Sequence, residues 1–112
     1  MTDQLETPAN FLVLMADEHN SKFLGCAGHD LVKTPNLDAL AARGARFTNA
    51  YTNSPICVSA RASLATGQYV HEHQCWDNAI AYEGTPASWA HKLQETGHPV
   101  TSIGKLHYYS DE

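Results

Sequence analysis

The sequence predicts an α/β fold, and three observations support this prediction. Residues 10–17, NFLVLMAD, form a continuous apolar run that ends in an acid, which is typical of a strand buried on both faces of a parallel sheet. Helix-like and strand-like segments then alternate along the chain. Of the 112 residues, 43% are apolar and 17% charged, which is ordinary for a globular domain and too apolar for a disordered chain.

Three segments have the apolar spacing of a helix, follow a turn that contains proline, and end at glycine. The predicted helices open at Thr34-Pro35, at about Val58 and at Thr85-Pro86, and they end at Gly44, Gly67 and Gly97. Thr34 is expected to cap the first helix. In the third helix, Trp89, Ala90 and Leu93 are expected to face inward.

Two further segments, residues 45–51 and 98–103, are predicted to be strands, and residues 71–81 a loop. The resulting sheet is mainly parallel and flanked by helices. So few strands would leave its edges and faces bare. We therefore interpret residues 1–112 as the incomplete N-terminal portion of a single domain.

The charge and cysteine content restrict the partners and the compartment. A formal net charge of −5 argues against nucleic acid or an anionic membrane as a general partner. Three cysteines cannot all pair, and the polar N-terminus does not have the pattern of a signal peptide. No apolar run is long enough to span a bilayer. The sequence predicts a cytoplasmic protein, and it leaves the oligomeric state open.

Asp17 and Glu18 follow the first predicted strand, at the sheet edge where open α/β folds bind ligands. Hard cations prefer clustered carboxylate oxygens, so this pair is a candidate metal site. The alternative, two solvated loop acids, is the simpler interpretation when this site is considered alone.

Cys57 lies at the start of the second predicted helix, where free backbone N–H groups and the helix dipole favour an anion. Arg61, four residues later, lies on the same helix face and could neutralise an oxyanion or hold a modified side chain at position 57. A buried small residue and a surface arginine explain the two positions equally well.

Lys105 and His107 alternate after the last predicted strand, so both point the same way if the chain stays extended. A cation and an acid/base group on one side suit an anionic substrate whose leaving group needs a proton. His71 and His73 would also share one side of an extended segment, but their spacing to Cys75 is not that of a standard zinc site.

The order of these motifs resembles that of the type I sulfatases. Residues 57–69, CVSARASLATGQY, resemble that family's signature of C-x-P-x-R or C-x-A-x-R followed by T-G-x-Y. The segments around the signature also match the family in register. The family's first strand with its metal-binding acids is similar to LVLMADEHN, and the segment leading into its signature is similar to KTPNLDALAARGARFTNAYTNSPIC. The family's G-K-x-H motif is similar to TSIGKLHYY. The resemblance covers residues 10–109 and points to the choline-sulfatase and phosphonate-monoester-hydrolase branch.

The resemblance implies an alkaline-phosphatase-like α/β fold and hydrolysis of sulfate esters. It implies that Cys57 is oxidised to formylglycine, the nucleophile, and contacts the metal. Arg61 would steady the formylglycine hydrate, Lys105 would contact the sulfate, and His107 would assist proton transfer at position 57. Asn78 would contact the substrate.

The resemblance also implies a divalent metal, with Asp17 as a ligand and Glu18 at the second acid position. An oxygen-rich site suits Ca²⁺ or Mg²⁺, and the phosphonate hydrolases resemble Mn²⁺ enzymes. Family members have several hundred residues and take further metal ligands from later segments. The remainder of a sulfatase chain is therefore an expected partner, beside a small sulfate ester.

Two positions depart from the family pattern. Ser59 stands where the family has proline or alanine, which bears on recognition by the machinery that makes formylglycine. Glu18 stands where the classical enzymes have a second aspartate. The resemblance leaves two alternative functions. One is a phosphonate monoester or phosphodiester hydrolase with the same nucleophile, because similar motifs serve both reactions. The other, favoured by Ser59, is a non-catalytic fragment in which Cys57 is unmodified.

Overall fold

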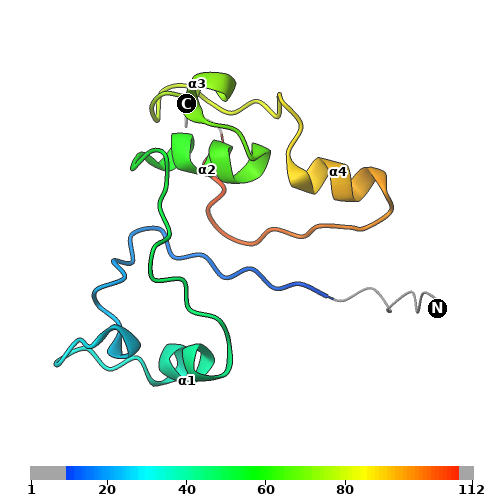
Figure 1. The fold of residues 1–112 in the computed structure, drawn as a ribbon. Coiled ribbons are helices and arrows are strands. Elements are labelled where there is room, and N and C mark those ends of the chain that lie inside the picture. The colour runs from blue at the N-terminus through cyan, green and yellow to red at the C-terminus, as the bar shows by residue number, and fades with distance from the viewer. Residues whose placement is uncertain (1–9, 109–112) are drawn as a thin grey trace, which may run out of the picture. The chain divides into compact units, whose positions relative to one another are not determined.

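The computed structural model describes residues 10–108, which divide after Arg46 into two compact units. Tyr109, the acidic end of the chain and the polar N-terminus lie outside the described residues. Short helices joined by long loops build both units (Figure 1). In chain order the elements are the 3-10 turn η1 (Gly25–Ala27) and the helices α1 (Pro35–Arg43), α2 (Cys57–Thr66), α3 (Val70–His73) and α4 (Trp89–Glu95).

The first unit is organised around the carboxylate of Asp38, on α1. Its Oδ1 accepts hydrogen bonds from the Cys26 backbone N–H (2.7 Å) and from the Thr34 hydroxyl (2.8 Å). The Thr34 hydroxyl in turn accepts the Gly25 N–H at 2.8 Å. The hydrogen bond from Thr34 is the largest of the influences that lower the pKa of Asp38. These bonds fasten η1 to the start of α1.

The predicted first helix is confirmed, but the predicted cap is only partly right. Thr34 does occupy the N-cap position, and its carbonyl accepts the Asp38 N–H at 2.8 Å. Its hydroxyl, however, bonds to no helix N–H. The hydroxyl donates to the Asp38 carboxylate, and its oxygen accepts the Gly25 N–H in place of a helix N–H.

The second unit is built around α2, which contacts α3 and α4. Its core consists of five buried apolar residues: Val58, Ala62, Ala65, Cys75 and Tyr82. The first three come from one face of α2, and Tyr108 packs against the cluster from the end of the described chain. The Tyr82 N–H also donates to the Tyr108 carbonyl oxygen (2.8 Å), and the two rings meet edge to face. The segment after residue 104 is thereby held against the α2 core.

The predicted second helix is confirmed and begins one residue earlier, at Cys57. It ends at Gly67, whose left-handed backbone (φ 72°) lets its N–H donate to the Ser63 carbonyl oxygen. The longest helix in residues 10–108 has ten residues, and none of the described helices has the length and hydropathy to cross a membrane.

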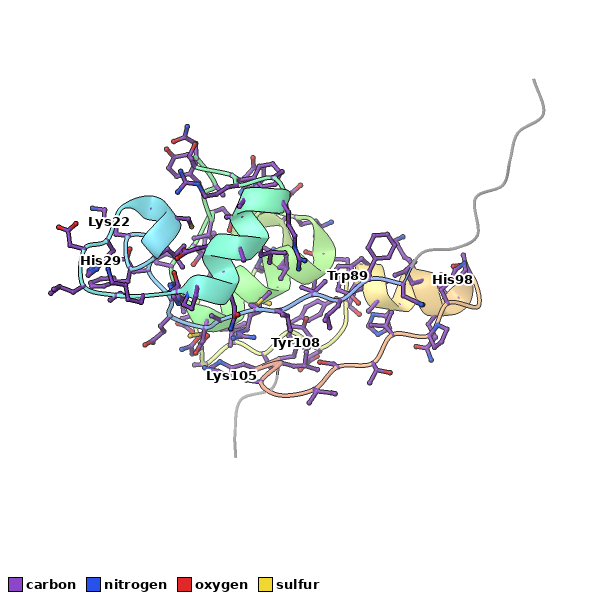
Figure 2. The ribbon with its side chains drawn as sticks, turned by 90° about the horizontal axis from the view of Figure 1, so that it is seen from below. Lys22, His29, Trp89, His98, Lys105 and Tyr108 are labelled. Carbon is purple, nitrogen blue, oxygen red and sulfur yellow. The ribbon has the colours of Figure 1, made fainter. Side chains whose placement is uncertain are left out.

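The third predicted helix starts later than expected, after Ser88 rather than at Thr85-Pro86. The Ser88 hydroxyl accepts the His91 N–H and so supplies the cap that starts α4. The predicted inward face is wrong, because Trp89 is 44% and Leu93 41% exposed. Figure 2 shows Trp89 at the beginning of α4 and His98 just beyond its end.

The predicted parallel sheet is not present in residues 10–108, which contain no strand. Residues 11–14, expected to be buried on both faces, are exposed by 69% to 90%. Residues 45–51 and 98–103 are likewise without strand pairing. A strand forms only where a neighbouring strand accepts its backbone hydrogen bonds, and the described residues bring no two of these segments into a ladder.

The prediction of a loop over residues 71–81 is wrong at its start, because His71 and His73 belong to the helical turn α3. Residues two apart on a helix point to opposite sides. His71 accordingly stacks on Tyr69 at the surface, whereas His73 is buried. The shared side expected for these imidazoles does not exist.

We predict that Gly25→Ala destabilises the first unit. A Cβ at position 25 would lie 2.3 Å from Asp38 Oδ2, so the carboxylate must leave the bonds that it makes with Cys26 and Thr34. The expected result is a lower midpoint of thermal unfolding and faster hydrogen exchange at the Cys26 amide.

The same substitution made in an Asp38→Ala background is the control, because the clashing group is then absent. It should cause little further loss of stability there. Equal losses in both backgrounds would contradict the assignment of the Asp38 carboxylate as the cause.

Candidate active site

Cys57 is the first residue of α2 and is half-buried. Ile56, in extended conformation, precedes it as the N-cap and forms no side-chain cap with the helix. The first N–H groups of a helix have no partner within the helix and must find one elsewhere. Position 57 therefore stands among backbone donors, as the sequence predicted.

Asn78 supplies one of these missing partners. Its Oδ1 accepts the hydrogen bond of the Val58 N–H at 3.0 Å, across twenty residues of sequence. Asn78 thus caps α2 from the loop after α3, a role that sequence reasoning missed. The substrate contact expected for Asn78 stays a prediction.

Arg61 connects α2 to the segment that carries Lys105 and His107. Its Nη1 donates to the Lys105 carbonyl oxygen at 2.7 Å. Its charge also acts on Tyr108: burial raises the pKa of the Tyr108 hydroxyl, and the nearby guanidinium opposes part of that rise. The structure therefore brings Arg61 together with the G-K-x-H segment through a backbone atom of Lys105. Figure 2 labels Lys105 and Tyr108 on this segment.

His107 does not continue the extended chain expected from the sequence. It adopts a left-handed backbone with φ 53°, which is uncommon for residues other than glycine. Its ring is half-buried, and Nδ1 is buried without a hydrogen-bond partner. The predicted alternation of Lys105 and His107 therefore fails at His107. A buried ring nitrogen without a hydrogen-bond partner is energetically costly.

Ser59, the residue that departs from the family signature, is fully buried in α2 at 0% exposure. Its hydroxyl oxygen has no hydrogen-bond partner. It packs on the face of the helix that forms the core, where proline or alanine would leave no polar atom. Residue 59 is thus a packing position, in which the hydroxyl contributes no bond.

Asp17 and Glu18 lie in the first unit, exposed, at a bend that follows the apolar run. The structure describes that unit separately from the second, so it gives no distance between these acids and Cys57. Within residues 10–108 no three His, Cys, Asp or Glu side chains gather in a way that could hold a metal ion. The two carboxylates have the oxygen donors that a hard cation prefers, but they are fewer than the six or so that it takes.

A polar network that is buried at His73 and exposed at Asn53 was not predicted from the sequence. Ser63 Oγ lies 2.8 Å from His73 Nε2 and 3.0 Å from Asn53 Oδ1. Burial lowers the pKa of His73 and raises that of the neighbouring Cys75 thiol. The excess of histidines was the only signal in the sequence, and it did not distinguish the buried His73 from the exposed His71.

Known proteins resemble this chain over nearly all of its length. The family model named Sulfatase matches residues 9–110. A choline-sulfatase of Rhizobium meliloti is 40% identical over 99 residues, which are 88% of this chain and 19% of that protein. An N-acetylglucosamine-6-O-sulfatase of Bacteroides thetaiotaomicron is 34% identical over 102 residues (91% and 18%). Human arylsulfatase K is 31% identical over 101 residues (90% and 19%).

These matches confirm the resemblance inferred from the motifs. The chain spans about a fifth of the length of the curated relatives it matches. The family implies an α/β fold, although the described residues contain no sheet.

We predict that Ser59→Ala stabilises the protein. The substitution removes a buried hydroxyl that has no partner and places a better helix former within α2. The free energy of unfolding should rise by about 1 kcal/mol, measured by chemical denaturation. Ser63→Ala is the matched control on the same helix, because it removes a bonded hydroxyl and should lower stability. A less stable Ser59→Ala protein would mean that the hydroxyl has a partner.

We predict that the second unit loses stability as the pH falls below the usual pKa of histidine. The pKa of His73 is lower in the folded protein than in the unfolded chain, because burial disfavours the charged ring. The unfolded chain therefore binds the proton first, so the contribution of neutral His73 is complete above about pH 6.5 and declines toward the folded pKa. Unfolding of wild type and of His73→Gln, measured between pH 5 and about pH 8, should show this loss only in wild type. Parallel curves for the two proteins would assign the loss to another group.

Proposed function

Because this chain belongs to the sulfatase family, we propose that it supplies the nucleophile-bearing part of an enzyme that hydrolyses sulfate esters through a formylglycine made from Cys57. The observation that carries this proposal is the position of Cys57 at the first turn of α2, with Arg61 one turn later and bonded to the Lys105 carbonyl. Helix N–H groups and a guanidinium on one face suit a substrate with anionic oxygens.

Arg61 is proposed to hold the oxygens at position 57. Its bond to the Lys105 carbonyl restricts the guanidinium, so less rotational freedom remains to be lost when an oxyanion binds. The planar group can still direct donors toward position 57 from the same helix face. A lysine at position 61 would have no planar group with several fixed N–H donors.

His107 is proposed to move the proton at position 57, and Lys105 to contact the sulfate. The support for His107 is its buried Nδ1 without a partner, on the segment that Arg61 holds against α2. Imidazole is the side chain most often used for general acid–base catalysis. The formylglycine hydrate, when present, would supply a hydroxyl that attacks sulfur while the S–O bond to the alcohol breaks and the alcohol leaves with a proton. The second hydroxyl would then collapse to the aldehyde, which breaks the C–O bond to sulfate and expels it.

A divalent cation is proposed to be held in part by Asp17, with Glu18 beside it and with position 57 as a further ligand. Ca²⁺ suits such carboxylate oxygens, and Mg²⁺ or Mn²⁺ are the alternatives. A cation there would stabilise the negative charge that develops on the sulfate oxygens. Two carboxylates are too few for such an ion, so the remainder of the sulfatase chain is the proposed source of further ligands.

A small sulfate ester is the proposed substrate, and the choline-sulfatase relative favours a compact one. A phosphonate monoester or phosphodiester would present similar anionic oxygens to Arg61 and is the second candidate. Turnover of matched sulfate, phosphonate and phosphate esters by the complete enzyme separates the two. A cytoplasmic location is proposed because the three cysteines of the sequence cannot all pair.

We predict that position 57 carries an aldehyde in protein from a host that makes formylglycine. Trypsin cleaves after Arg46 and Arg61, so the mass of peptide 47–61 reports the state of this residue. The expected mass is lower than that of the thiol by the difference between cysteine and formylglycine, and an aminooxy reagent should label the peptide.

Peptides 23–33 and 62–92 contain Cys26 and Cys75 and are internal controls that should keep the mass of a thiol. A fully unmodified thiol in peptide 47–61 would contradict the proposed mechanism. It would favour the non-catalytic alternative, for which the serine at position 59 is the specific observation.

A further inference from the structure

Ser63 lies at the centre of a directed chain of hydrogen bonds that joins three segments of the second unit. The Cys75 backbone N–H donates to His73 Nδ1 at 3.1 Å, so this nitrogen carries a lone pair. In the neutral ring the proton is then on Nε2. Nε2–H therefore donates to Ser63 Oγ (2.8 Å), and the Ser63 O–H donates to Asn53 Oδ1 (3.0 Å).

Burial fixes the direction of this chain. His73 is only 7% exposed and Cys75 is buried beside it. Burial disfavours the charged imidazole and lowers the pKa of His73, against a smaller opposing influence of Glu72. Because neutral His73 donates from Nε2, the Ser63 hydroxyl oxygen is the acceptor of that bond. The hydroxyl proton is then donated to Asn53 Oδ1.

Asn53 belongs to the turn through which the chain enters Cys57. Within this turn the Thr52 hydroxyl donates to the Ser54 carbonyl (2.8 Å), and the Ile56 N–H donates to Ser54 Oγ (3.3 Å). These bonds shape the turn from inside. The bond from Ser63 fastens it to the body of α2, because Ser63 lies on the second turn of that helix.

We propose that Ser63 is a positioning residue for position 57, acting through Asn53. Ser63 lies six residues after Cys57, about 240° around the helix, so it faces away from Cys57 and Arg61 and acts through the entry turn instead. The direction in which the chain enters α2 decides where the side chain at position 57 points. This inference rests on the proposed function only in treating position 57 as the nucleophile.

The reactivity of the Cys57 thiol tests this inference, in protein from a host that does not convert the residue. Alkylation by iodoacetamide is followed on tryptic peptide 47–61. Ser63→Ala should raise the alkylation rate of Cys57 about fivefold, the size expected when one hydrogen bond no longer opposes opening of the turn. Asn53→Ala should give the same increase, and the double variant no further one.

Two variants separate positioning from packing. Ser63→Thr retains the hydroxyl and should keep the wild-type rate. Ser59→Ala removes a buried hydroxyl without a partner from the same helix and should leave the rate unchanged. Cys26, in the first unit, is the reference thiol.

Three outcomes would overturn the inference: a wild-type rate in Ser63→Ala, a Ser63→Thr protein that behaves like Ser63→Ala, or an equal rise at the buried Cys75, which would indicate general loosening of the unit. The proposed function fails by a different result, a persistent thiol in protein from a converting host. Since alkylation is measured on the thiol form in either case, the two failures are distinguishable.

Discussion

The second unit depends on the burial of one face of α2. Val58, Ala62 and Ala65 recur at helical spacing and are almost fully buried. Small side chains on this face allow close approach, so Cys75 and Tyr82 pack directly on the helix from the following segments. Once that face is buried, the first turn is fixed as well. Cys57 and Arg61 then project from a helix whose orientation the core has already determined.

The helices of this chain were predictable because their signals are local. Pro35 at a first helical position and Gly67 in a left-handed end conformation are preferences of one or two residues, and both predicted helices formed where expected. The start of α4 was misplaced because Ser88 satisfies the helix N–H groups better than Thr85 can. The strands were not predictable in the same way, because a strand requires a partner that an apolar run such as residues 11–14 does not specify.

The sequence predicted that two of the candidate residues share one helix, but it did not predict the hydrogen bonds that this helix makes. The spacing of Cys57 and Arg61 indicated a shared helix face, and the structure confirms that both lie on α2. No spacing rule could show that Asn78 caps this helix across twenty residues, or that Arg61 bonds the Lys105 carbonyl. Such contacts depend on how loops return to the core, which Tyr82 and Tyr108 decide through their backbone bond and their ring contact.

The start of α2 is held from three directions, and each contact has a different chemistry. Asn78 satisfies a helix N–H, Arg61 binds the Lys105 carbonyl, and Ser63 binds the turn that precedes Cys57. For the nucleophile proposed at position 57, misplacement would lower the rate steeply, so rigid support would have catalytic value even where it does not touch the substrate. Hydrogen bonds also restrict orientation more than apolar packing does, since a hydrogen bond weakens sharply when its angle departs from linear. Apolar burial places α2, and these three polar contacts orient its first turn.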